Sequence, residues 1–177
     1  MQELNTLIKQ CNALLVDIPE HKKLLAGLFY YKYLSDRLLF RVSFLLEEPE
    51  NNLQQAQAVY AEAWADDARS DLINDLGHEC GYLIKPGNTI NGLAKQVALT
   101  TTTIKNALTQ IKLFDNKQLS QDLSKINIGD VNPVTWQQLL KQLTTVAVIS
   151  PDNDAQTPIL PAAAVFLQQV QKIIITL

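Results

Sequence analysis

The sequence is poor in the residues from which most self-contained active sites are built. Its 177 residues include two histidines, two cysteines and six glycines. The glycines are scattered, so there is no glycine-rich loop that could hold a phosphate. Cys11 and Cys80 lie far apart and give neither a disulfide framework nor the repeated spacing of a metal site. This cysteine usage favours a reducing compartment, the cytoplasm.

One local group of potential metal ligands is present, at His78, Glu79 and Cys80. A tetrahedral zinc site needs a second pair of ligands, which the neighbouring sequence does not supply. A Cys/His nucleophile pair would need an orienting group and an oxyanion site, and neither is visible. We therefore expect a chain that is not an enzyme on its own and has no catalytic, cofactor or metal residues.

Long uninterrupted hydrophobic runs are also missing. The stretches 24–46 and 159–177 are apolar, but charged or amide side chains interrupt both of them. A charge near the centre of a bilayer costs about 3 kcal/mol even on a lenient scale. No basic segment followed by an apolar core opens the chain. We expect neither membrane insertion nor secretion.

Hydrophobic residues instead recur at intervals of three and four, the pattern of amphipathic helices. Residues 22–47 contain one glycine and no proline and are apolar on nearly every face, which predicts a long central helix enclosed by others. A short extended run closed by a Pro-Gly turn is expected at 81–86. The fold class is therefore predicted to be all-α, a multi-helix bundle. Further helices are predicted at 1–16, 53–64, 72–77, 88–97, 104–119 and 133–143.

The end of the sequence has a different organisation. Residues 150–161 hold three prolines and two aspartates, which is typical of a linker. We expect residues 162–177 to form a helix with polar side chains on one face. The other face carries an apolar stripe, which is typical of a helix that docks on another surface. We divide the chain into a helical domain (1–149), a linker (150–161) and a docking helix (162–177). The stripe consists of Phe166, Val170, Ile173 and Ile174.

Charge is distributed unevenly along the chain. The net charge is +3 over residues 20–41, −8 over residues 47–79 and +4 over residues 85–125, although the whole chain carries only −3 at pH 7. An acidic block therefore lies between two basic ones. The basic blocks could face nucleic-acid phosphate, which attracts Lys and Arg whatever the base sequence, or they could be solvated helix faces.

Asn132-Pro133 invites comparison with the Asn-Pro-Pro-aromatic turn with which DNA amino-methyltransferases hold an extruded base. Here Val134 and Thr135 replace the second proline and the aromatic residue. No glycine-rich cofactor turn precedes the pair. We interpret it as the start of a helix.

Residues 24–37, Leu-Leu-Ala-Gly-Leu-Phe-Tyr-Tyr-Lys-Tyr-Leu-Ser-Asp-Arg, resemble the signature helix near the start of the methylation subunit of type I restriction-modification systems. The resemblance covers about residues 4–130. In that family a Rossmann-like domain follows, which binds S-adenosylmethionine and methylates adenine at N6, whereas this sequence ends at Leu177. A fragment, a shortened paralogue and a stand-alone protein all remain open. The signature helix belongs to the helical N-terminal domain of that subunit. Later parts of this sequence resemble further landmarks of that domain, in the same order: residues 60–64, 81–86, Phe114 and 123–128.

The resemblance implies a non-catalytic domain that contacts DNA and helps to assemble the methyltransferase. Its implied partners are a second methylation subunit, a specificity subunit and, weakly, duplex DNA, and a homodimer is possible. S-adenosylmethionine is expected only in the missing catalytic domain. The candidates for contact with DNA phosphate are Arg37, Arg41, Lys85, Lys95 and Lys105.

An alternative function belongs to another class. The chain could be an interaction or regulatory module that binds the methylation or specificity subunits without touching DNA. The acidic block would repel phosphate, and the stripe of the docking helix would need a partner.

Overall fold

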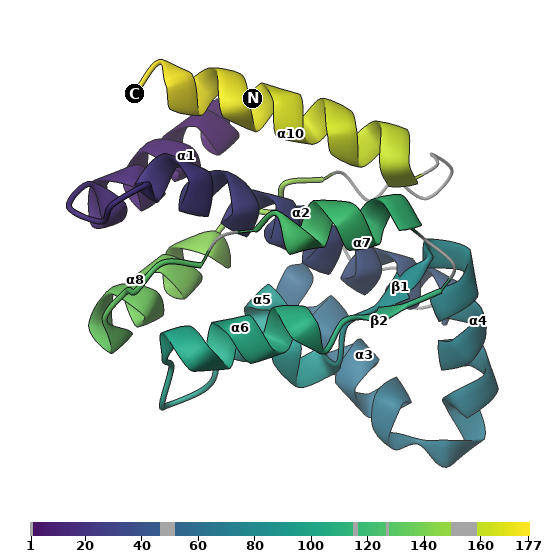
Figure 1. The fold of residues 1–177 in the computed structure, drawn as a ribbon. Coiled ribbons are helices and arrows are strands. Elements are labelled where there is room, and N and C mark those ends of the chain that lie inside the picture. Colours follow the sequence, from purple (N-terminus) through teal and green to yellow (C-terminus); the bar gives the residue numbers. More distant parts are fainter. Residues whose placement is uncertain (1, 47–51, 115–116, 127, 150–158) are drawn as a thin grey trace.

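The computed structural model describes residues 2–46, 52–114, 117–126, 128–149 and 159–177, with the side chains of 159–161 left aside. The described residues form a bundle of α-helices with one small two-stranded sheet (Figure 1). The predicted all-α class is confirmed. The helices are α1 (Gln2–Leu15), α2 (His21–Leu45), α3 (Leu53–Ala65), α4 (Ser70–Cys80), α5 (Ile90–Leu93), α6 (Thr101–Thr109), α7 (Lys117–Ser124), α8 (Pro133–Leu143) and α10 (Ile159–Ile175).

Among the residues described, two 3-10 turns and two short strands lie between the helices. The turns are η1 (Asp67–Arg69) and η2 (Pro86–Asn88). Strands β1 (Tyr82–Leu83) and β2 (Lys112–Leu113) pair antiparallel. The extended run expected at 81–86 therefore exists and is closed by η2 at the Pro-Gly turn.

Helix α2 is the central element, as predicted. Helices α1, α3 and α10 pack against it, and in Figure 1 it runs between α10 on one side and α5 and α6 on the other. A Cβ atom at Gly27 would lie 2.7 Å from Cγ2 of Ile126. Glycine at this position therefore lets the segment that follows α7 pack directly on α2.

Local capping explains where several helices begin. Thr100 caps α6 and forms a capping box with Thr103. Asn132 caps α8 by accepting a hydrogen bond from the Thr135 N–H at 2.9 Å, with Pro133 in the first turn. The interpretation of Asn132-Pro133 as a helix start is confirmed.

Three helix boundaries differ from the prediction. Helix α4 continues through Gly77, where a Cβ would lie 2.5 Å from the Phe114 ring, and ends at Gly81 with φ of 76°. The helix expected at 88–97 is only the four residues of α5, and its cap is Thr89. The helix expected at 104–119 ends at Thr109, because the residues that follow pair with β1.

Helix α10 packs on α2 and contacts α1. It begins at Ile159, inside the range predicted as linker, while residues 150–158 lie outside the described residues. The rings of Phe166 and Tyr33 stack with their centroids 4.9 Å apart. Among the described helices, none has the length and apolar character needed to span a bilayer.

Candidate functional site

The segment that carries the family resemblance, residues 24–37, lies on α2 and faces the interior. The Tyr31 hydroxyl donates a hydrogen bond to the carbonyl oxygen of Asn88. The Ser35 hydroxyl oxygen accepts one from the Ile90 N–H at 2.9 Å. Both bonds attach the segment between β1 and α5 to the central helix. These side chains are occupied by internal contacts and are not free to bind a ligand.

Lys32 and Asp36 form an ion pair inside the core. Nζ of Lys32 lies 2.8 Å from Oδ2 of Asp36, and both side chains are fully buried. The same carboxylate accepts a hydrogen bond from the Val148 N–H at 3.0 Å. Burial raises the pKa of Asp36, against the opposing effects of Lys32 and this hydrogen bond. The pair thus joins α2 to the segment that follows α8.

Side chains of α3, in addition to those of α2, form hydrogen bonds to the turn after β1. The Gln57 amide donates to the carbonyl oxygen of Pro86 at 2.9 Å, and the Tyr60 hydroxyl donates to that of Ile84 at 2.8 Å. A Cβ at Gly92 would lie 2.0 Å from the Pro86 carbonyl oxygen, so only glycine permits this approach. The turn is therefore fixed, and it exposes Lys85.

The two arginines predicted to contact phosphate are engaged within the chain. Arg37 is half-buried, and its Nη1 lies 3.4 Å from the Tyr33 hydroxyl. Arg41 forms an ion pair with Glu79 of α4, and its guanidinium lies 5.2 Å from the centre of the Phe44 ring. An arginine neutralised in this way attracts phosphate less than a free one does.

The three predicted lysines are exposed and lie on different elements. Lys85 follows β1, Lys95 follows α5, and Lys105 is on α6. Lys95 and Lys105 line two different hollows. The structure therefore does not gather the five predicted cations into one cluster. A block of charge in the sequence does not reveal which face of a helix is exposed, so this arrangement could not be predicted.

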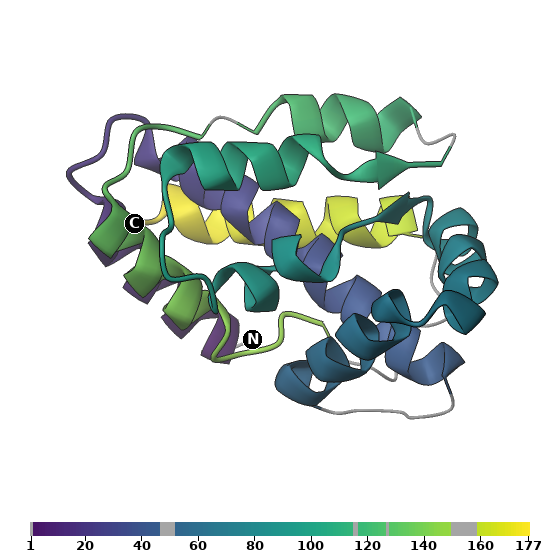
Figure 2. The ribbon, with the colours of Figure 1, turned by 90° about the horizontal axis from the view of Figure 1, so that it is seen from below.

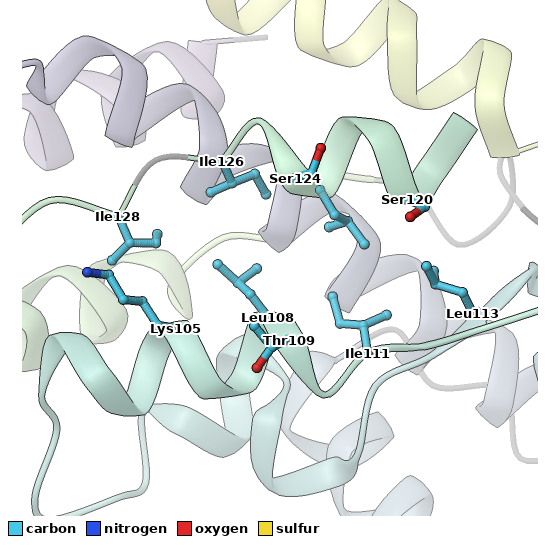
Figure 3. A pocket seen from close by; sticks show the side chains of 10 residues that line it. Lys105, Leu108, Thr109, Ile111, Leu113, Ser120, Ser124, Ile126 and Ile128 are labelled. Atoms are coloured by element: carbon cyan, nitrogen blue, oxygen red, sulfur yellow. The ribbon is translucent and has the colours of Figure 1, made fainter. Parts of the chain in front are cut away.

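Lys105 lies at one end of a groove between α6 and α7 with a volume of about 470 Å³ (Figure 3). Hydroxyl groups of Thr109, Ser120 and Ser124 lie along it. A groove of this composition suits apolar side chains of a partner, with one cation at its end. Its apolar lining comes from Leu108, Ile111, Leu113, Leu123, Ile126 and Ile128.

Lys95 lines the second hollow, which has a volume of about 460 Å³ and lies beside α5 and α8. Lys141, in the last turn of α8, lines it as well. Lys141 is not among the predicted cations, because nothing near it in the sequence marks it. The remaining lining residues are Gln54, Asn91, Ala94, Gln96, Gln137 and Thr144.

His78, Glu79 and Cys80 are the last three residues of α4, and their side chains have different surroundings. The His78 ring meets the Phe114 ring edge-on at 4.6 Å, whereas Cys80 is buried and burial raises its pKa to about 12. Burial also raises the pKa of Cys11 to about 12. Neither thiol is a ready nucleophile at neutral pH. Among the described residues, no group of three or more such side chains could hold a metal ion.

The stripe predicted to dock on a partner is covered by the chain's own core. Phe166, Val170 and Ile174 are buried, and Ile173 is half-buried. The helix therefore docks on α2 and α1 of this chain and not on a free surface for another subunit. An apolar stripe shows that a face is covered but does not show by what.

No protein-family model matches the sequence, and no curated protein matches it either. Among solved structures, the chain is similar to the methyltransferase subunit of a type I restriction-modification system from Streptococcus thermophilus, with a TM-score of 0.72 and 22% sequence identity. The match covers 99% of this chain and 38% of that one, and thus reaches past residue 130 into α10. This chain therefore has the fold of part of a type I restriction-modification methyltransferase subunit.

Proposed function

We propose that this chain is a non-catalytic domain of a type I restriction-modification adenine-specific DNA methyltransferase, where it contacts DNA and helps to assemble the subunits. The observation that carries the proposal is the fold likeness, which covers 99% of this chain but only 38% of the similar subunit. Binding of S-adenosylmethionine and methyl transfer would then belong to another part of the methyltransferase. The implied partners are a methylation subunit and a specificity subunit.

The three exposed lysines are the side chains best suited to contact DNA. Helices α5, α6 and α8 lie on the side of the molecule away from α10 (Figures 1 and 2), and Lys95 and Lys105 belong to this side. Lysine contacts to phosphate position a protein on DNA without reading its bases. Because Arg37 and Arg41 are engaged internally, the proposal depends mainly on Lys85, Lys95 and Lys105.

The DNA contact is tested by titrating the full chain against a labelled duplex and following fluorescence anisotropy. Three phosphate contacts should make binding fall about 40-fold between about 50 and 200 mM salt. The triple variant Lys85→Gln, Lys95→Gln, Lys105→Gln should lose most of this binding. A matched triple variant at other exposed lysines, Lys9→Gln, Lys22→Gln, Lys172→Gln, should retain it. Salt-independent binding, or no binding, would contradict the DNA contact.

A second function is favoured by a different observation. Helices α3 and α4 and the turn between them expose a row of carboxylates that would repel phosphate, and the groove between α6 and α7 offers an apolar surface. Together they favour a module that binds the methylation or specificity subunits without contacting DNA. The exposed carboxylates are Glu62, Asp66, Asp67, Asp71 and Asp75.

Co-purification with tagged methylation and specificity subunits separates the two functions. The variant Leu108→Ser, Leu123→Ser changes the groove, and Val134→Ser on α8, where the side chain is 62% exposed, is its control. Capture that is lost only in the groove variant, in a chain that does not bind duplex, would favour the second function. Deleting residues 151–177 is unsuitable for this test because it would open the core under α10.

A further inference from the structure

The hollow beside α5 and α8 is positively charged without compensation. Lys95 and Lys141 both line it, and no carboxylate is among its lining residues. Within the described part of the chain, neither lysine takes part in an ion pair. Two lysine side chains from separate elements that line one hollow, with no carboxylate in the lining, favour an anion there.

The walls of this hollow are fixed by hydrogen bonds. The Gln96 amide donates to the carbonyl oxygen of Gly87 at 2.9 Å, and the Gln137 amide donates to that of Val97 at 3.0 Å. These bonds tie the segment that carries Lys95 to η2 and to α8, which preorganises the wall. Preorganisation of this kind lowers the entropic cost of binding a small charged group.

Asn91 adds a hydrogen-bond acceptor to the lining of the hollow. It lines the hollow and is only 3% exposed, and its Nδ2 donates to the Leu53 carbonyl oxygen at 3.0 Å. Its Oδ1 has no hydrogen-bond partner among the described residues. Buried polar atoms are normally paired, and this one is an acceptor, so it would pair with a proton donor such as a lysine ammonium or water and not with a phosphate oxygen.

The start of α3 adds to the positive field. Helix α3 has 13 residues and begins at Leu53, and Gln54 of its first turn lines the hollow. The N-terminal end of a helix carries a partial positive charge and favours anions. The charge of the lysines and the helix end therefore act in the same direction.

We propose that this hollow binds a phosphate group, held between Lys95 and Lys141. Phosphate is favoured over a carboxylate because its tetrahedrally arranged oxygens can accept hydrogen bonds from two ammonium groups on two elements at once. A volume of about 460 Å³ also leaves room for the group to which the phosphate is attached. The inference rests on the proposed function only for the source of the phosphate, which would be the DNA backbone.

The experiment uses the full chain, the double variant Lys95→Gln, Lys141→Gln, and the control Lys9→Gln, Lys172→Gln, which removes the same charge elsewhere. Circular dichroism first checks that all three have the same helicity. Because the two lysines would hold one phosphate, anisotropy with a labelled duplex should show a salt dependence whose logarithmic slope falls by about one in the pocket variant and stays unchanged in the control. In parallel, NMR follows the amide signals of residues 91, 95 and 141 as inorganic phosphate replaces chloride at equal ionic strength.

The outcomes separate this proposal from the DNA contact. Equal duplex binding by both variants, with no phosphate-dependent NMR shifts, overturns the phosphate site and leaves the DNA contact in place. Phosphate-dependent shifts that are lost in the pocket variant, in a chain that binds no duplex, support the site with a free phosphate compound as its source and overturn the DNA contact. Selective loss of duplex binding in the pocket variant supports both.

Discussion

The side chains of Lys32 and Asp36 show how the centre of the molecule tolerates charge. They lie four residues apart on α2, so they meet on one face of the helix. Each buried ion loses several kcal/mol of hydration free energy. The attraction between the two charges and the hydrogen bond from Val148 offset this loss. Removing one partner should therefore cost more than removing both.

The first prediction concerns this pair. Asp36→Asn keeps an oxygen that can accept from the Val148 N–H but leaves Lys32 uncompensated, so the free energy of unfolding should fall by about 3–5 kcal/mol. Adding Lys32→Met should restore much of it. Urea unfolding followed by circular dichroism measures both changes. A single variant as stable as the parent chain would show that the buried charges are not coupled.

The two buried thiols predict a decline of stability at alkaline pH. The pKa of each thiol is raised from 9.0 to about 12, because burial disfavours the thiolate. Above pH 9 the unfolded chain loses these protons while the folded chain keeps them. The free energy of unfolding should therefore fall as the pH rises from about 9 to about 12. Urea unfolding at pH 8 and pH 10.5 measures this decline.

The double variant Cys11→Ala, Cys80→Ala is the control for this pH dependence. Its decline should be smaller but should not vanish, because burial also raises the pKa of Tyr31 and Tyr82. Equal declines in both chains would contradict the assignment to the thiols. In the parent chain at pH 8, Ellman's reagent should react with neither thiol until the protein is unfolded.

At the scale of elements, α10 is part of the core. Its buried side chains pack on α2, and the stacked pair of Phe166 and Tyr33 lies in that contact. The third prediction is that Phe166→Ala lowers the free energy of unfolding by about 3–5 kcal/mol. Val165→Ala is the control: that neighbouring side chain is 55% exposed and should change stability by less than about 0.5 kcal/mol. Similar effects of the two substitutions would show that α10 does not depend on this packing.

The elements that were predicted correctly are those with local causes. Asn132 and Thr100 cap helices through hydrogen bonds to residues three positions later, so their role is visible in the sequence. The end of α6 was missed because it depends on the pairing of Leu113 with Tyr82, far away in the chain. Lys141 was missed for the same reason, since three separate segments create its hollow.

At the scale of the whole molecule, the described residues share one core. Buried hydrophobic residues from α1 through α10 form a single cluster in the described part of the chain. The fourth prediction is therefore a single cooperative unfolding transition. In the variant Trp64→Phe the buried Trp136 is the remaining tryptophan and its fluorescence reports on α8, while circular dichroism reports on all helices. The two transitions should coincide, and an early loss of helicity would mean that α10 unfolds separately.

The internal role of residues 24–37 affects how related chains should be interpreted. Tyr31, Ser35 and the pair of Lys32 and Asp36 are constrained by the contacts that close the fold, whatever the surface binds. Exposed lysines such as Lys95 are under no such constraint. During divergence, a chain could exchange its ligand and still carry a recognisable version of this segment. The segment thus reports on architecture, whereas activity has to be inferred from the side chains that face the solvent.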